Sequence, residues 1–227
     1  MEPGHRTGDA APPFVPSTMF LAWVLVVGAV LVIGAVHDSQ PPQPSAAQAF
    51  STPVAGPTPS RSAAPSAPAV RPLPPAEPDR IRIPAIRVNA PMTKLALDRE
   101  GALRPPSADK PNLAGWYGKG TAPGSKGTAL IAGHVDLPGG RPGVFFELGS
   151  LSKGDTIEVS RADRRTAVFT VNAVEVYKKS GFPSEKVYGS SDRPELRVIT
   201  CGGGYAKKTG YLGNVVAYAT LTEVKQL

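Results

Sequence analysis

The sequence from residue 80 to residue 227 predicts an all-β domain that forms a closed or nearly closed barrel. Seven or eight short segments either alternate apolar and polar residues or form brief apolar runs, and Gly, Pro, Asn and Asp turn signals separate them. Scarcely any stretch repeats its apolar residues at helical spacing. Closure is favoured because a barrel leaves no exposed strand edges.

The expected strands follow one another along the whole domain. They are short runs around Pro84 at 81–83 and 86–88, a run at 91–95, a buried strand at 128–132, a strand at 156–159, the longest alternation at 167–177, a half-buried strand at 196–199 and a closing strand at 214–221. Residues 144–151 predict a short helix or turn. The glycines at 202–204 are expected to end the preceding strand and to open a loop that reaches residue 213.

An apolar segment at 19–36 precedes this domain and follows a polar tail, 1–18, which we expect to be disordered. All eighteen residues of the segment are apolar or Gly, and as a helix they would span about 27 Å, close to the hydrocarbon thickness of a bilayer. We expect an uncleaved transmembrane anchor, with a cleaved signal peptide as the alternative. Arg6 on the N-terminal side favours a cytoplasmic N-terminus and an extracytoplasmic domain.

The segment 37–79 has the composition of a linker. Twelve of the 38 residues from 41 to 78 are proline, and most of the others are Ala, Ser, Thr, Gln or Gly. Proline removes backbone donors and fixes φ, and few large apolar groups are present to be buried. We therefore expect a semi-stiff spacer between membrane and barrel, or else a tail without such a role.

The charge of the chain favours anionic surroundings. Its 25 Lys and Arg against 18 Asp and Glu leave a net charge of +7, which suits lipid headgroups or cell-wall polymers. The basic residues are scattered, form no run longer than two, and are not interleaved with aromatic residues. We therefore predict no nucleic-acid partner.

Cys201 is the only cysteine of the chain, so it cannot form an internal disulfide. A lone cysteine is ordinarily a small buried hydrophobic residue. However, His134 is the only histidine of the predicted barrel, and both residues are expected at the exits of core strands. This combination, in an exported domain, fits a cysteine nucleophile with an imidazole acid/base. No cluster of carboxylates indicates a metal site, and no cofactor is predicted.

Ordered motifs across residues 80–223 resemble the sortase family. They include T-A-L-I-A-G-H-V-D, G-V-F-F-E-L, L-R-V-I-T-C-G-G and N-V-V-A-Y-A, together with an upstream G-W-Y-x-x-G. The C-G-G after the strand and the W-Y before the glycine-rich loop are most similar to the class F sortases of actinobacteria. The resemblance implies an eight-stranded sortase β-barrel, with Cys201 in the position of the nucleophile and His134 in that of the acid/base.

The same resemblance implies a membrane-anchored cysteine transpeptidase. Such enzymes cleave an L-P-x-T-G type sorting signal between Thr and Gly, hold the Thr carbonyl as a thioester, and pass it to an amine. The implied partners are secreted proteins with a C-terminal sorting signal and an amine of the peptidoglycan precursor or another protein. Two alternatives remain: a hydrolytic thiol peptidase with sortase-like chemistry, and a non-catalytic domain that binds wall polymers or peptides.

One part of the family pattern is missing. Sortases usually carry an arginine near the start of the last strand, and no arginine follows Cys201 in this chain. Arg141, in the loop after His134, is our first candidate to replace it. Arg197 is expected on the same face of its strand as Cys201, but four residues of strand separate their backbones by about 13 Å. The remaining candidates are Asn214, Lys207 and Lys208.

Overall fold

The structure, a computed structural model, describes residues 40–51 and 70–226. The chain divides into two units, Met1–Gln40 and Pro41–Leu227, and only Gln40 of the first unit is described. The expected anchor, 19–36, thus lies outside the described residues. Within the described part, no helix combines the length and the apolar character needed to cross a bilayer.

Strands make up most of the described elements. In chain order they are β1 (Pro78–Ile83), η1 (Pro84–Ile86), β2 (Val88–Leu95), β3 (Ala114–Tyr117), β4 (Gly127–Ala132), β5 (Asp136–Leu137), β6 (Arg141–Pro142), η2 (Leu148–Ser150), β7 (Thr156–Arg161), β8 (Arg165–Lys178), α2 (Ser184–Tyr188), β9 (Pro194–Ala206) and β10 (Gly210–Gln226). The five-residue α2 is the only α-helix among the described residues and was not predicted from the sequence, whereas the short helix or turn predicted at 144–151 contains the 3-10 turn η2.

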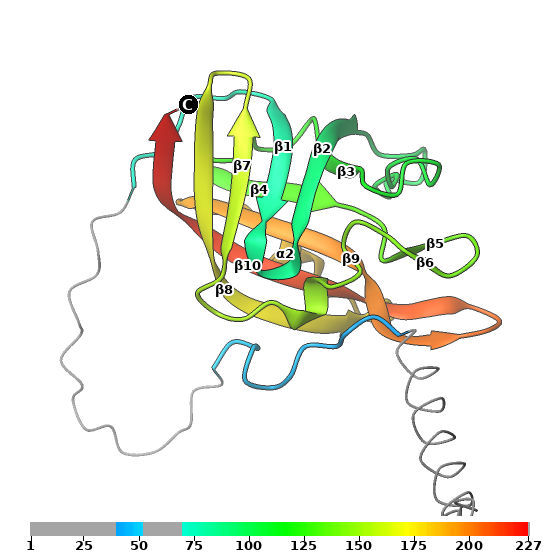
Figure 1. Cartoon of the computed structure of the whole chain (residues 1–227). Helices are drawn as coiled ribbons and strands as arrows, with labels where there is room; N and C mark the ends of the chain where they lie inside the picture. The colour runs from blue at the N-terminus through cyan, green and yellow to red at the C-terminus, as the bar shows by residue number, and fades with distance from the viewer. Residues whose placement is uncertain (1–39, 52–69, 227) are drawn as a thin grey trace, which may run out of the picture. The chain divides into compact units, whose positions relative to one another are not determined.

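Eight of the described strands close a barrel in the order β1-β2-β3-β4-β9-β10-β8-β7. Figure 1 shows this barrel, with the small β5–β6 hairpin projecting from it. Most neighbouring strands are antiparallel, but β2 with β3 and β4 with β9 are parallel. The predicted all-β closed barrel is therefore confirmed, and the parallel β4–β9 pair is the feature that builds the site.

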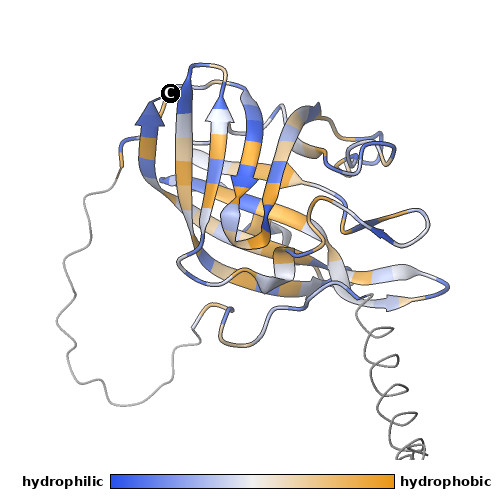
Figure 2. Cartoon of the chain, viewed as in Figure 1, coloured by the Kyte–Doolittle hydropathy of each residue, from blue (hydrophilic) through white to orange (hydrophobic). Residues whose placement is uncertain are grey.

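The period-two alternation of the sequence becomes the two faces of the barrel wall. In β4, the residues Gly127, Ala129 and Ile131 are buried, and the intervening residues are half-buried. Figure 2 shows the resulting alternation of hydrophobic and hydrophilic residues along the strands. Ile81, Ile157, Phe169, Leu196 and Val198 belong to the core cluster inside the barrel.

Two predicted element boundaries are wrong. The glycines after Cys201 do not end the strand, because β9 continues to Ala206 and pairs with β10 as a hairpin. Gly203 and Gly204 adopt φ values of +74° and +89°, which glycine tolerates without strain, so the ladder continues with a register shift instead of breaking. Ile86 belongs to the 3-10 turn η1 and not to a strand, because Pro84 begins that turn.

Two pieces of the predicted linker lie against the barrel. In the first, the Phe50 ring packs edge-on against Tyr218 at a centroid distance of 4.9 Å, and the Val174 N–H donates to the Gln48 carbonyl at 2.9 Å. In the second, the Leu73 N–H donates to the Gly124 carbonyl at 2.8 Å. Neither piece forms a helix, and β1 begins only at Pro78.

Candidate active site

The parallel pairing of β4 with β9 brings His134 and Cys201 together. The ladder runs from Gly127 opposite Pro194 to Ala132 opposite Ile199. Two further bonds continue it: the Gly133 N–H donates to the Ile199 carbonyl at 3.2 Å, and the Thr200 hydroxyl donates to the Gly133 carbonyl at 2.9 Å. The two backbones are therefore bonded up to the residues that immediately precede His134 and Cys201.

Gly133 is required at this junction by close packing. A Cβ at this position would lie 2.5 Å from a methyl group of Val144 and 2.6 Å from the ring of Phe145. The Phe145 N–H also donates to the His134 carbonyl at 3.0 Å. The turn after β4 is thus pressed against residues 144–145, and this contact fixes the backbone that carries His134.

The imidazole of His134 is half-buried and has one hydrogen-bond partner. Its Nε2 lies 2.8 Å from the carbonyl oxygen of Pro106, in the loop between β2 and β3. A carbonyl only accepts hydrogen bonds, so this contact assigns the proton to Nε2 and leaves Nδ1 as the free nitrogen of the neutral ring. The imidazole of His134 is therefore oriented by a carbonyl of the β2–β3 loop and keeps one nitrogen available for proton transfer.

Cys201 is half-buried in β9, directly opposite Asn214 of β10. The sequence places it at the end of the strand, whereas the structure places it in the middle of a longer one. Burial raises the pKa of the Cys201 thiol above its usual value of 9.0, because the charged thiolate loses solvation. The Lys179 ammonium opposes this effect, and the Asp136 carboxylate adds to it.

The sequence analysis did not single out Asp136, Lys179 or Tyr211. Asp136 stands two residues after His134 in the G-H-V-D motif, so the motif itself carried the signal. Lys179 comes next to Cys201 only because β8 pairs with β10, where its N–H donates to the Leu212 carbonyl at 2.9 Å. Tyr211 donates to Asp136 at 2.7 Å. The proximity of Lys179 and Tyr211 to the predicted site cannot be inferred from linear spacing.

The candidates for the missing arginine lie in different surroundings. Arg141 is exposed in the β5–β6 hairpin. Arg197 is buried, pairs with Glu195 at 2.6 Å and stacks on the Tyr218 ring at 4.5 Å. Lys207 and Lys208 lie in the turn between β9 and β10. Asn214 is opposite Cys201, so it is the closest of the candidates along the strand pairing.

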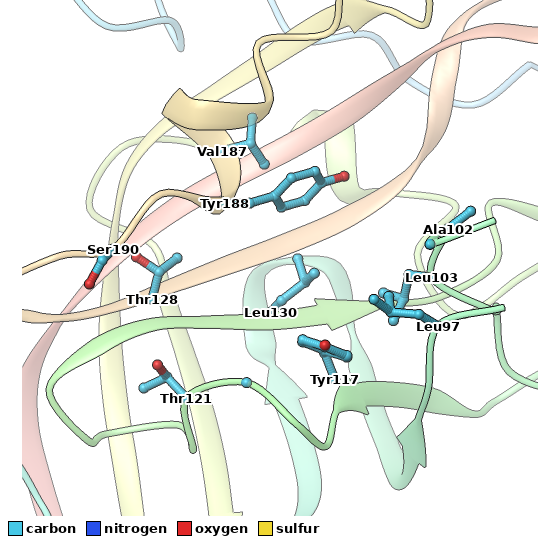
Figure 3. A pocket seen from close by; sticks show the side chains of 12 residues that line it. Leu97, Ala102, Leu103, Tyr117, Thr121, Thr128, Leu130, Val187, Tyr188 and Ser190 are labelled. Carbon is cyan, nitrogen blue, oxygen red and sulfur yellow. The ribbon is translucent and has the colours of Figure 1, made fainter. Parts of the chain in front are cut away.

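An apolar cavity of about 550 Å³ is lined by residues of β3, β4, α2 and the adjoining loops, and neither Cys201 nor His134 is among them. Figure 3 shows Leu130 of β4 and Tyr117 of β3 with Leu97 and Leu103 of the β2–β3 loop, while Tyr188 of α2 lies across from them. Leu130 shares its strand face with Ala132, and continuing this alternation leads to His134. Leu130, which lines the cavity, therefore lies on the strand face whose continuation carries His134.

The described residues include no group of three or more His, Cys, Asp and Glu arranged to hold a metal ion. The polar groups at and around Cys201 include a thiol, an imidazole, a carboxylate, a phenol, an amine and an amide. Of these, the thiol and the imidazole have the nucleophile and acid/base functions that acyl transfer requires.

Comparison with known proteins agrees with this architecture. A model of the sortase domain matches residues 81–222. Among solved structures, sortase A from Listeria monocytogenes is similar, with a TM-score of 0.50 and 20% identity, covering 67% of this chain and 91% of that chain. The SrtA sortase from Actinomyces oris has a TM-score of 0.52 and 20% identity, and the match covers 70% of this chain and 90% of that chain. Among curated proteins, none matches this chain.

The closed eight-stranded barrel is the fold of the sortases. Because the domain model covers well over half of the sequence, the chain belongs to the sortase family, whose members are cysteine transpeptidases.

Proposed function

We propose that this protein is a membrane-anchored sortase of the class F type. It cleaves an L-P-x-T-G type sorting signal between Thr and Gly through a thioester on Cys201, and it transfers the acyl group to an amine. The observation that carries the proposal is the hydrogen bonding of β4 to β9 up to Gly133 and Thr200. Within a sortase barrel, this bonding supports Cys201 as the nucleophile and His134 as the acid/base.

The chemistry follows from the two side chains. The Cys201 thiolate attacks the threonine carbonyl carbon and forms a C–S bond. When the tetrahedral intermediate collapses, the C–N bond to glycine breaks, and protonated His134 gives its proton to the leaving nitrogen. The acceptor amine then attacks the thioester and loses a proton to His134, and the thiolate departs.

The cavity supports an apolar sorting signal. Leu130, Tyr117 and Leu103 provide an apolar surface for the Leu-Pro part of the signal, and Val187 and Tyr188 of α2 form the opposite wall (Figure 3). Leu130 lies four residues before His134, so we expect a peptide held in the cavity to continue along β4 and to present its threonine carbonyl near the end of the strand. Burial of the leucine side chain would contribute about 1.5–3 kcal/mol to binding.

Lys179 is our proposed cation for the tetrahedral intermediate. A developing oxyanion needs a hydrogen-bond donor or a positive charge, and the usual arginine is missing. Among the described residues, Lys179 is the cation whose charge lowers the pKa of Cys201. Its ammonium therefore favours negative charge at this site. Asn214, opposite Cys201, supplies a neutral amide donor on the neighbouring strand.

The apolar segment 19–36 anchors the protein with the barrel outside the cytoplasm, where secreted proteins that bear sorting signals and the peptidoglycan precursor are accessible. The net charge of +7 suits this anionic surface. The C-G-G and W-Y motifs support the class F assignment.

Full-length protein in detergent micelles, incubated with an L-P-x-T-G peptide and triglycine, tests the proposal. We expect a transfer product and a thioester at Cys201 by mass spectrometry. Free acid without transfer would indicate a hydrolytic enzyme, and peptide binding without thioester would indicate a non-catalytic domain. Cys201→Ala should abolish the thioester and change the free energy of unfolding by no more than about 1–3 kcal/mol. His134→Gln should lower the transfer rate about 10²–10⁴-fold.

A further inference from the structure

A side-chain hydrogen bond joins the segment after His134 to the hairpin that contains Cys201. The Tyr211 hydroxyl donates to Oδ2 of Asp136 at 2.7 Å. Asp136 begins β5, and Tyr211 lies in β10, three residues before the partner of Cys201. Among the described residues, no other side-chain hydrogen bond connects β5 to β10. Figure 1 shows the two hairpins, β5–β6 and β9–β10, that this bond links.

The bond brings three polar groups together. The charge of the Asp136 carboxylate raises the pKa of the Cys201 thiol. Negative charge at Cys201 in turn raises the pKa of the Tyr211 hydroxyl. Burial and the bond to Asp136 both raise the pKa of Tyr211, so its hydroxyl stays protonated and continues to donate. Tyr211 therefore takes up part of a negative charge that would otherwise oppose the thiolate.

The titratable and polar groups near Cys201 come from several elements. They are His134 after β4, Asp136 on β5, Lys179 after β8, and Tyr211 and Asn214 on β10. Lys179 and Asp136 have opposite effects on the thiol, and Tyr211 is the group that pairs with the unfavourable charge.

We propose that Tyr211 and Asp136 are positioning residues that hold the loop after His134 against the hairpin after Cys201 and turn the Asp136 charge away from the thiol. This inference rests on the proposed function. The backbone hydrogen bonds near Gly133 fix the start of the turn that carries His134, but they do not reach β5, which follows that turn. The Tyr211–Asp136 bond is what ties that continuation to β10.

Two substitutions distinguish the positioning role of the Tyr211–Asp136 hydrogen bond from the effect of the Asp136 charge. Asp136→Asn removes the charge but keeps an amide oxygen that accepts the Tyr211 hydrogen bond. Tyr211→Phe removes the bond but keeps the charge. Tyr205→Phe is the matched control, because Tyr205 lies on the same hairpin with its ring 5.3 Å from that of Tyr211 and does not contribute to the bond.

Iodoacetamide alkylation of full-length protein across pH 6 to 11 measures the apparent pKa of Cys201 without any sorting peptide. We expect Asp136→Asn to lower this pKa by about 0.5–1 unit and Tyr211→Phe to raise it. In peptide transfer, Tyr211→Phe should lower kcat about tenfold through misplacement of the reacting groups, with KM nearly unchanged. Tyr205→Phe should match the wild type in both measurements.

If Asp136→Asn and Tyr211→Phe both keep the wild-type alkylation profile, the inference is overturned. It is also overturned if both variants shift the pKa in the same direction, because a merely structural bond would act that way. Failure of the proposed function has a different signature: the wild type itself would form no thioester, while the alkylation profiles would still separate the variants.

Discussion

The Thr200 hydroxyl donates to the Gly133 carbonyl at 2.9 Å, and these two residues immediately precede Cys201 and His134. Thr200 is 4% exposed, so the bond is shielded from water. It continues the β4–β9 ladder one step beyond the last backbone pair. A side chain, and not only the sheet, therefore sets the relative position of the proposed nucleophile and acid/base.

Thr200→Val should loosen this junction while preserving shape. Because a buried carbonyl loses its partner, we expect the free energy of unfolding to fall by about 0.5–1.5 kcal/mol. The transfer kcat should fall while KM changes little. Urea unfolding and peptide kinetics measure the two effects. Thr170→Val is the control, since it removes an exposed bond to Thr222 and should leave kcat unchanged. An unchanged kcat in Thr200→Val would contradict the positioning role.

The pH dependence of Cys201 should reflect its burial. A raised pKa means that the thiol keeps its proton to higher pH, so the thiolate is the minor form at neutral pH. We therefore expect the alkylation rate of the wild type to keep rising through pH 9, with a midpoint above the usual value of 9.0. A midpoint at or below 8.5 would show that the neighbouring positive charge outweighs burial.

Lys179→Met should weaken catalysis by removing the positive charge near the thiol. We expect kcat/KM to fall about tenfold, less than the 10²–10³ typical of a buried oxyanion donor, because Lys179 is exposed. The loss should shrink at high salt, where the wild-type charge is already screened. Lys178→Met and Arg141→Met are matched controls and should stay within about twofold of wild type. An equal loss in Arg141→Met would restore Arg141 as the replacement for the missing arginine.

Arg161 should be the charged residue on which folding depends most. Its side chain is fully buried, pairs with Asp163 at 2.9 Å, and donates to the carbonyls of Pro123 and Pro74. Arg161→Met leaves those acceptors unpaired, so we expect a loss of about 3–5 kcal/mol in the free energy of unfolding. Arg82→Met, which removes an exposed pair with Glu158, should cost no more than about 1 kcal/mol. Equal losses in urea unfolding would contradict this assignment.

Much of the barrel could be predicted because its strands are locally encoded. The alternation in 167–177 and 214–221 lies within β8 and β10, since each half-buried strand must place apolar residues on one face. The hairpin after Cys201 was missed because glycine interrupts the pattern without preventing pairing. Tyr211 opposite Tyr205 shows that the ladder continues there.

The contacts of Phe50 and Gln48 with the barrel could not be predicted either. Proline-rich composition predicts a spacer because it excludes helix and sheet, and the described pieces form neither until β1 begins at Pro78. Composition does not reveal whether such a segment packs against a surface. Phe50 does so through the ring of Tyr218, which belongs to a strand far along the chain.

By itself, the sequence determined the fold class, the single thiol, the single histidine of the barrel and the order of the sortase motifs, because each of these depends on residue identity and local spacing. Only the tertiary structure decided what surrounds the thiol. Asp136, Lys179 and Tyr211 approach Cys201 from three different strands or strand ends. Their proximity depends on strand order and register, which arise from the closure of the whole barrel and not from any one segment.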